Sequence, residues 1–312
     1  MLTVEQIADY GQIMNEVAAV RRFNRVITQR VGALEDEYLS RQRSLGLSRL
    51  LWEIGPEGTE VRSLRARLGL DSGYVSRQLR VLESQGLVQV SADSGSEDGR
   101  VRTARLTAAG VAERELLDRA SDQLAESMLQ PLTAGQRARL VAAMAEAEKL
   151  IIASLVRVEI TDPRRPEARY CLRSYFDELG GRFDAGFDPS QSISASDDEM
   201  SLPEGLLLVA TLQGDPVGCG ALKLHSDTGI GEVKRMWVSR SVRGLGLGRR
   251  LLETLAGEAS SRGMHTLRLE TNETLSEARH LYETSGFVEV EAFNDEPYAH
   301  HWFQRDLTNA AG

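Results

Sequence analysis

A strand, a glycine-rich turn and a helix follow one another between Gly231 and Leu255. The run from Glu232 to Val238 predicts a strand, and an amphipathic helix is expected from near Gly248. Between them, Arg243, Gly246 and Gly248 have the spacing R-x-x-G-x-G. Glycines let the backbone bend sharply and let a ligand approach its N–H groups. The unpaired N–H groups and the dipole at a helix start favour an anion. This stretch therefore predicts a phosphate or pyrophosphate site.

The same turn also fits an ordinary connection between a strand and a helix, and that alternative is open from these residues alone. Two other nucleotide-binding patterns do not fit. A P-loop requires Lys followed by Ser or Thr, which is absent here. The glycines at Gly244, Gly246 and Gly248 do not have the G-x-G-x-x-G spacing of the dinucleotide fingerprint.

A second motif lies downstream, where Leu269 to Phe287 read LETNETLSEARHLYETSGF. Together, R-x-x-G-x-G and the later T-N followed by A-x-x-L-Y-x-x-x-G-F resemble motifs A and B of the GNAT acetyltransferases. The resemblance covers about half of the chain, from near Val156 to the end. It implies an α/β fold with a mixed, mostly antiparallel sheet, and acetyl-CoA as the acetyl donor.

The resemblance also implies a set of site residues. In this family the turn's backbone N–H groups wrap the pyrophosphate, and the preceding strand pairs with pantetheine and polarises the thioester carbonyl. Tyr282 occupies the position of a tyrosine that protonates the departing thiolate, although a packing role is the alternative. The implied cofactor-binding residues are Met236, Trp237, Val238, Arg243, Gly244, Leu245, Gly246, Leu247, Gly248, Arg249, Asn272, Ala278 and Tyr282.

The catalytic base is less clearly indicated. Glu232 lies where some family members carry a base carboxylate, and a salt-bridged strand residue is the alternative interpretation. A water chain or one of three histidines, His225, His300 and His301, is also possible. No residue pattern resembles a Ser-His-Asp triad, a metal site or a glycosidase carboxylate pair, so no metal is expected.

The acetyl acceptor is expected to be an amine of a small molecule or a protein. Arg169, Arg173, Tyr170 and Tyr175 fall on a helix expected at Pro163–Phe183, near where family members line the acceptor site. Arginines there would bind a carboxylate, which suggests an amino-acid-like acceptor. The polar segment that follows is expected to be a mobile loop beside the substrate site.

The first half of the chain predicts a helix-turn-helix. Two short helices are expected, at Glu60–Leu68 and Gly73–Gln85, joined by Gly69-Leu70-Asp71. Strands at Leu87–Val90 and Val101–Leu106 would form a hairpin after the second helix, as in a winged helix. The expected N-caps are Thr59 for the first helix and Asp71 or Ser72 for the second.

The second of these helices is expected to lie in the major groove of DNA, where recognition helices contact bases through their N-terminal residues. Val75, Leu79 and Leu82 would face the core. Each arginine taken singly also fits a solvated surface charge. The expected DNA-binding residues are Ser72, Gly73, Tyr74, Ser76, Arg77 and Arg80, together with Arg100 on the wing.

The run Asp98-Gly99-Arg100, followed by Arg105-Leu106-Thr107 and Gly110, resembles the D-x-R…L-T-x-x-G signature of MarR-type winged-helix regulators. The resemblance covers about residues 3–153. It implies a double-stranded DNA operator as partner, Arg100 in the minor groove, and a homodimer built from the terminal helices. Packing within one chain is the alternative explanation for the apolar stripes of those helices.

Composition sets the outer limits. The 312 residues, 41% of them hydrophobic, allow two ordinary domains, expected at 1–155 (DNA binding and dimerisation) and 156–312 (acetyl transfer). A net charge of −9 does not exclude DNA binding, which depends on the local face. Two cysteines provide no disulfide framework. With no signal-peptide pattern and no apolar run near the roughly 20 residues of a membrane span, a cytoplasmic protein without membrane contact is expected.

The resulting hypothesis is a bifunctional transcription regulator and N-acetyltransferase. Two alternatives are open: a regulator whose GNAT-like half only senses acetyl-CoA or a metabolite, and an enzyme whose winged helix serves dimerisation alone. The operator sequence, the inducing ligand and the direction of any coupling between the halves do not follow from the sequence.

Overall fold

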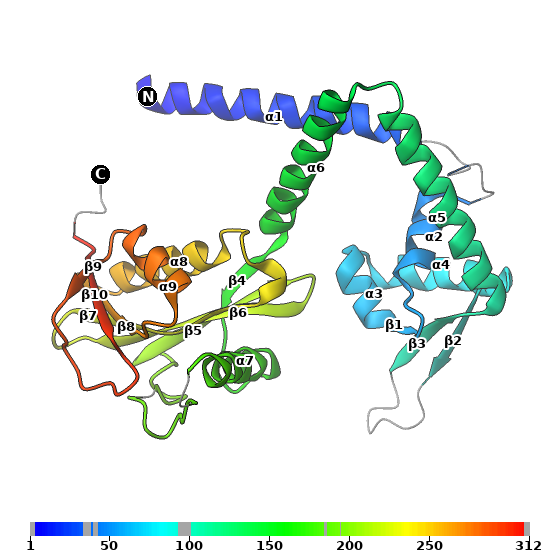
Figure 1. Ribbon diagram of the computed structural model, residues 1–312. Helices are drawn as coiled ribbons and strands as arrows, with labels where there is room; N and C mark the ends of the chain where they lie inside the picture. The colour runs from blue at the N-terminus through cyan, green and yellow to red at the C-terminus, as the bar shows by residue number, and fades with distance from the viewer. Residues whose placement is uncertain are drawn as a thin grey trace. The chain divides into compact units, whose positions relative to one another are not determined.

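The computed structural model of the chain describes residues 4–33, 39, 43–92, 101–183, 186–193 and 195–308 (Figure 1). It divides into two compact units, Met1–Val141 and Ala142–Gly312. The division falls within α6 (Ala134–Leu155), and the division expected from the sequence lies directly after that helix. Within the described ranges, no helix is both long and apolar enough to cross a membrane.

The first unit is mostly helical. A small antiparallel sheet in the order β1-β3-β2 completes it, and the buried side chains of its core include Leu50, Leu51, Leu79, Leu82 and Leu117. Its helices are α1 (Val4–Arg30), α2 (Leu45–Glu53), α3 (Val61–Leu68), α4 (Ser72–Ser84) and α5 (Ala108–Leu129), and its strands are β1 (Thr59–Glu60), β2 (Val88–Ala92) and β3 (Arg102–Leu106).

Helix caps in this unit follow the predicted chemistry with one exception. Asp71 accepts a hydrogen bond from Tyr74 N at the start of α4, and Gly69 ends α3 with a left-handed φ of 63°. The expected cap at Thr59 is wrong. Thr59 belongs to β1 and pairs with Ala104 of β3, so its hydroxyl accepts from Gly55 N instead. Helix α3 starts without a side-chain cap.

The second unit contains the mixed, mostly antiparallel sheet expected from the sequence. Its strand order is β4-β5-β6-β7-β8-β10-β9, and among these described strands the neighbours β7 and β8 alone run parallel. The strands are β4 (Arg157–Ile160), β5 (Gly205–Leu212), β6 (Asp215–His225), β7 (Ile230–Val238), β8 (Thr266–Thr271), β9 (Val288–Val290) and β10 (His301–Asp306); the helices are α7 (Pro166–Arg182), α8 (Leu247–Ser261) and α9 (Ser276–Glu283).

Helices cover both faces of this sheet: α8 and α9 lie on one side and α7 on the other (Figure 1). Side chains alternate between the faces of a strand, and β5 shows the result. Leu206 and Leu208 pack in the core that contains α8, whereas Leu207 and Val209 pack against α7. Because both faces are buried, β5 reads as a continuous apolar run in the sequence.

Candidate active site

The sheet opens between β7 and β8. These parallel strands pair at only three positions, Ile230 with Thr266, Gly231 with Leu267 and Glu232 with Arg268. Beyond them both strands continue without pairing to each other. A β-bulge accompanies the opening: the register between β6 and β7 shifts after Cys219, and Arg235 has a φ of 57°. Backbone groups of β7 that face the opening therefore have no ladder partner in β8 and are available to a ligand.

The glycine-rich turn after β7 has the bend expected of it. Gly244 and Gly246 have φ values of 80° and 75°, in the left-handed region that favours glycine. Gly246 is the N-cap of α8 and provides no side-chain cap. The first N–H groups of α8 are thus without side-chain or intrahelical partners, which is the local geometry of an anion site.

A main cleft of about 540 Å³ lies where β7, this turn, α7 and α9 meet. Of the thirteen cofactor-binding residues implied by the sequence, Leu245 and Asn272 do not line it. Leu245 lines a separate cavity, and Asn272 lines a compartment next to the cleft. The structure brings together at the cleft Met236, Trp237, Val238, Arg243, Gly244, Gly246, Leu247, Gly248, Arg249, Ala278 and Tyr282.

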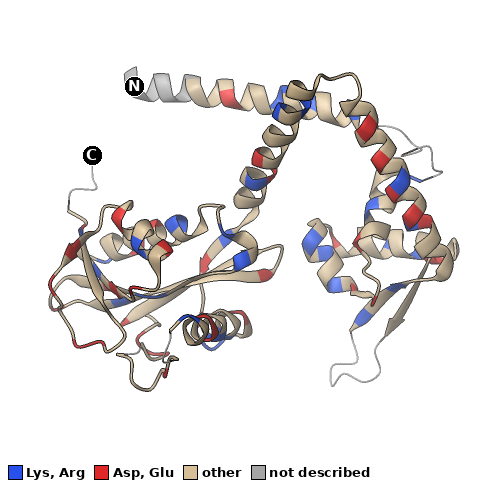
Figure 2. Ribbon diagram, in the orientation of Figure 1, with Lys and Arg blue, Asp and Glu red and all other residues tan. Residues whose placement is uncertain are grey.

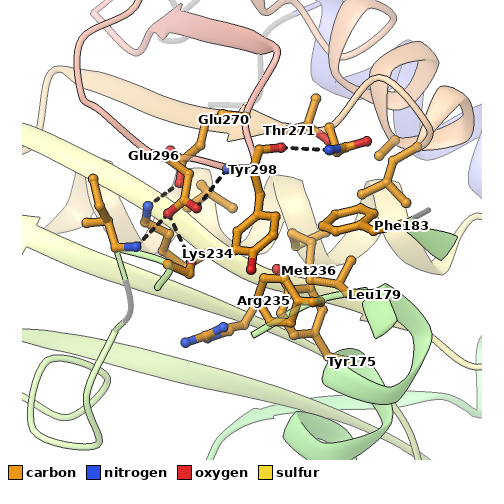
Figure 3. Close-up of a pocket in the computed structure, with 18 of the residues that line it drawn as sticks. Tyr175, Leu179, Phe183, Lys234, Arg235, Met236, Glu270, Thr271, Glu296 and Tyr298 are labelled. Atoms are coloured by element: carbon orange, nitrogen blue, oxygen red, sulfur yellow. Dashed lines mark hydrogen bonds and ion pairs between the residues drawn. The ribbon is translucent and has the colours of Figure 1, made fainter. Parts of the chain in front are cut away.

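A side compartment of about 100 Å³ adjoins the main cleft. Met236 and Tyr282 line both cavities, so the two meet at these residues. Figure 3 shows Lys234, Glu270 and Glu296 on one side of the Tyr298 ring, and Leu179 and Phe183 on the other. The remaining side-chain lining comes mainly from Tyr175, Phe187, Ser192, Ile193, Val233, Arg235, Thr271, Asn272, Leu275, Ala278 and Ala299.

Tyr282 lies at the junction of the two cavities. Its side chain packs against Phe287 and Phe303 and the residue is 6% exposed. Burial raises the pKa of its hydroxyl above the usual value, and the nearby Tyr175 and Glu270 act in the same direction. The hydroxyl therefore stays protonated at neutral pH. Its position fits the predicted acid, while the ring also fills the core.

The two carboxylates of the neighbouring strands differ. Glu232 lines neither cavity. Its oxygens bind Lys234 Nζ at 2.8 Å and His225 Nε2 at 3.3 Å. Although burial opposes ionisation, Lys234 holds the pKa of Glu232 below its usual value. Glu232 is thus held in salt bridges outside both cavities, and its role as a base stays a prediction.

Glu270, on β8, lines the side compartment. Its side chain is 8% exposed and pairs with Lys234 through Oε1, whereas Oε2 has no hydrogen-bond partner among the described residues. Burial raises the pKa of Glu270 despite the opposing charge of Lys234. The sequence reasoning missed this residue. Its signal was a carboxylate at a strand end, directly before the Thr271-Asn272 pair of the second motif.

Two expected cofactor contacts are engaged within the protein. The Arg243 guanidinium donates to Glu178 and to Val238 O, so its side chain would have to leave Glu178 to reach a pyrophosphate. The Asn272 amide donates to Tyr298 O and its oxygen accepts from Thr274. The Asn272 side chain is therefore bonded within the wall of the side compartment.

The groups proposed for an amino-acid-like acceptor are largely elsewhere. Arg169 binds Asp197, Arg173 is exposed, and neither arginine lines the cleft or the side compartment. Only Tyr175 of that set lines the two cavities. The expectation that arginines of α7 bind the acceptor's carboxylate gains no support from these two cavities and stays a prediction. None of the three candidate histidines (His225, His300 and His301) lines the side compartment or the cleft either.

In the first unit, α4 presents the residues expected to contact DNA. Ser72, Gly73, Arg77 and Arg80 are exposed and Tyr74 and Ser76 are partly exposed, while Val75, Leu79 and Leu82 are buried as predicted. Basic segments also mark α3 and the strand pair β2–β3 in Figure 2, where the exposed arginines are Arg62, Arg65, Arg102 and Arg105. Arg100 and Asp98 lie outside the described residues.

Comparison with known proteins concerns the second unit. The model of the acetyltransferase (GNAT) family matches residues 172–287. The IAA acetyltransferase of Azospirillum brasilense is 40% identical over 99 residues, which are 32% of this chain and 63% of that protein, so the chain spans less than two thirds of that relative's length. The uncharacterized N-acetyltransferase YsnE of Bacillus subtilis is 38% identical over 110 residues, 34% of this chain and 72% of that protein.

The chain is also similar to a solved structure, an acetyltransferase of the GNAT family from Staphylococcus aureus. The match covers 48% of this chain and 99% of that protein's chain, at 18% sequence identity and with a TM-score of 0.41. The turn, the cleft and the matched segment lie in one unit, and through that unit the chain belongs to the GNAT family of N-acetyltransferases, which use acetyl-CoA as the acetyl donor.

Proposed function

We propose that the protein transfers the acetyl group of acetyl-CoA to an amine at the junction of the main cleft and the side compartment. One observation carries this proposal. Tyr282, a protonated acid, lines both cavities, and Glu270, whose second oxygen lacks a described partner, lines the compartment beside it. A donor thioester in the cleft and an amine in the compartment would meet between these groups.

The cleft is proposed to hold acetyl-CoA by backbone groups. The free N–H groups at the start of α8 would bind the pyrophosphate, aided by the helix dipole. Backbone groups of β7 between Met236 and Val238 that face the opening toward β8 would bind the pantetheine amides and the thioester oxygen. Apolar lining at Leu247 and Leu281 would pack against the arm.

The reaction proposed here needs one base and one acid. Glu270 takes the proton of the bound ammonium, and the neutral nitrogen attacks the thioester carbonyl carbon. The C–N bond forms, the C–S bond breaks, and the leaving thiolate takes its proton from Tyr282, while the second proton lost by the newly acylated nitrogen restores the Tyr282 hydroxyl. Protonated Glu270 then releases its proton to solvent. Glu270 replaces Glu232 in this role because only Glu270 lines the side compartment.

The test is the release of free CoA from acetyl-CoA in the presence of a panel of amines, with the acetylated products identified by mass. Amine-dependent release that Tyr282→Phe slows is expected. Binding of acetyl-CoA without release, for any amine, would favour the alternative in which this unit only senses acetyl-CoA.

We further propose that the first unit is a MarR-like winged helix that binds double-stranded DNA. Helices α3 and α4 are joined by a short turn at Gly69, and the antiparallel pair of β2 and β3 follows, which is the order of a winged helix. The exposed start of α4, with Arg77 and Arg80, supports a major-groove contact. A labelled-duplex selection from genomic fragments tests this proposal.

A homodimer is part of the same proposal. Helix α1 exposes an apolar series, and α6 exposes Leu150 and Ile151 by 63% and 55%. A partner subunit covering such surfaces would remove them from water. Among the α1 residues whose burial the structure describes, the large exposed apolar side chains are Ile13, Met14, Val17, Val20, Phe23 and Val26. Light scattering on the full chain checks the mass of the assembly.

A further inference from the structure

The side compartment is walled by aromatic rings. The ring centroids of Phe183 and Tyr298 lie 5.7 Å apart in a stacked pair, and those of Phe187 and Tyr298 lie 4.8 Å apart. The rings come from the end of α7, the segment after it, and the segment before β10. The face of an aromatic ring carries negative electrostatic potential and attracts a cation. These rings therefore suit an apolar group attached to a positive charge.

The two cations of the described lining, Lys234 and Arg235, both have partners already. Lys234 pairs with both Glu232 and Glu270. The Arg235 guanidinium lies 4.5 Å from the ring centroid of Phe176 and extends away from Glu270 (Figure 3). Glu270 Oε2 is the buried polar atom of this lining that has no described hydrogen-bond partner. A bound ammonium would satisfy it, whereas a bound carboxylate would meet like charge.

Two segments that are far apart in the chain are joined along one wall of the compartment. Glu296 accepts hydrogen bonds from Ser192 Oγ and Ile193 N, and Asp188 N donates to the Tyr298 hydroxyl. These bonds hold the segment after α7 against the segment before β10. The compartment beside this wall has a volume of about 100 Å³, which favours a small acceptor.

We propose that the acetyl acceptor is a small primary amine whose body is apolar, preferably aromatic, and bears no carboxylate. This inference rests on the proposed acetyltransferase function. The ammonium binds Glu270 Oε2, and the body packs against Phe183, Phe187 and Tyr298. The nitrogen then loses its proton to Glu270 and attacks the thioester, as set out above.

The experiment compares four acceptors with the full chain and saturating acetyl-CoA: 2-phenylethylamine, phenylalanine, spermidine and a lysine-containing peptide. The first two share one body and differ only in the carboxylate. We expect kcat/KM for 2-phenylethylamine to exceed that for each of the others by at least about tenfold, because a second buried charge lacks a partner in the compartment.

A variant pair tests the aromatic wall. Tyr298→Leu should lower kcat/KM for 2-phenylethylamine by about 3- to 30-fold through loss of the ring face. Tyr298→Phe keeps the ring, loses only the hydroxyl bond to Asp188 N, and should retain most of the activity. Calorimetry with 2-phenylethylamine in the presence of CoA gives the same ranking as binding affinities. Unchanged melting and acetyl-CoA affinity of both variants check that the fold is intact.

Each outcome is decisive. Faster transfer to phenylalanine, spermidine or the peptide overturns this inference and leaves the acetyltransferase proposal standing. Binding of acetyl-CoA with no transfer to any of the four also overturns it. Equal loss in Tyr298→Leu and Tyr298→Phe removes the aromatic wall from the account. Absence of both acetyl-CoA binding and CoA release contradicts the proposed function itself.

Discussion

Glu270 and Lys234 form an ion pair in which both side chains are 8% exposed. Lys234 also binds Glu232 at 2.8 Å, so one cation serves two carboxylates on adjacent strands. The environments of the two carboxylates shift their pKa values in opposite directions. Glu232 is held on the far side of Lys234 with a lowered pKa, while Glu270 lines the side compartment with a raised pKa and an oxygen without a described partner.

Glu270→Gln should therefore lower kcat/KM by roughly 10²- to 10⁴-fold, the usual range for loss of a general base. Glu273→Gln, an exposed neighbour outside both cavities, is the matched control and should behave as wild type. Steady-state CoA release measures both. If Glu270→Gln keeps full activity, the base is another group or a water chain.

The pH profile should follow the same carboxylate. Only ionised Glu270 accepts a proton, so kcat/KM falls as the pH drops through its pKa. Because burial raises that pKa, the acid limb should lie above the ordinary glutamate value of about 4.3. Ionisation of Tyr282 should not limit activity below about pH 10, since its pKa is also raised. An acid limb that persists in Glu270→Gln would assign it to a different group.

Tyr282→Phe removes the proton donor and keeps the packing against Phe287 and Phe303. We expect kcat to fall about 10²-fold or more, with acetyl-CoA affinity and DNA affinity unchanged. Single-turnover kinetics and calorimetry separate the two quantities. A full-rate variant would leave Tyr282 as a packing residue alone.

In the first unit, Arg77→Ala should weaken DNA binding and reduce the slope of log K against log salt by about one phosphate contact. Arg119→Ala, an exposed arginine on α5, is the control. Arg100→Ala is expected to act like Arg77→Ala, from the family resemblance. Acetyl transfer should be unaffected in all three. Identical salt slopes for Arg77→Ala and Arg119→Ala would remove α4 from the DNA interface.

Gly110→Ala should destabilise the first unit, because a Cβ there would lie 2.0 Å from Leu87 O, a backbone atom. We expect a loss of about 1–3 kcal/mol, typical of overpacking. Gly135→Ala, in α6 with nothing within 4 Å, is the matched control and should stabilise by up to about 1 kcal/mol through helix propensity. Thermal unfolding of both variants provides the measurement. Equal effects would show that α5 does not pack against Leu87 as described.

The sequence predicted strands and helix caps correctly where they depend on neighbouring residues alone. The strand expected from Glu232 to Val238 lies within β7, and Asp71 caps α4 as expected. Thr59 was misassigned because its strand pairing with Ala104 joins residues far apart in the chain. A threonine that could cap a helix and a threonine that pairs in a sheet look the same in the sequence. In the structure, Thr59 takes only the second of these roles.

The site shows the same limit. Backbone positions in the turn follow from glycine spacing, since a left-handed φ at Gly244 and Gly246 needs no distant partner. The choice between Glu232 and Glu270 depends on where β7 and β8 separate, after three paired positions. The ion-pair partner of Arg243 is Glu178, which lies on α7. Neither the separation of β7 and β8 nor the Arg243–Glu178 pair can be recognised from a local sequence motif.

The central claim is that the amides around Gly246 hold acetyl-CoA between β7 and β8. Titration calorimetry of acetyl-CoA into the chain and into two variants tests it most directly. Gly246→Asp puts a carboxylate at the expected pyrophosphate, whereas Gly263→Asp places the same residue at another glycine of left-handed φ, beyond the end of α8. We predict at least a roughly tenfold loss of affinity, about 1.4 kcal/mol, for Gly246→Asp alone. Equal affinities in all three proteins, or no binding to any, would contradict the account.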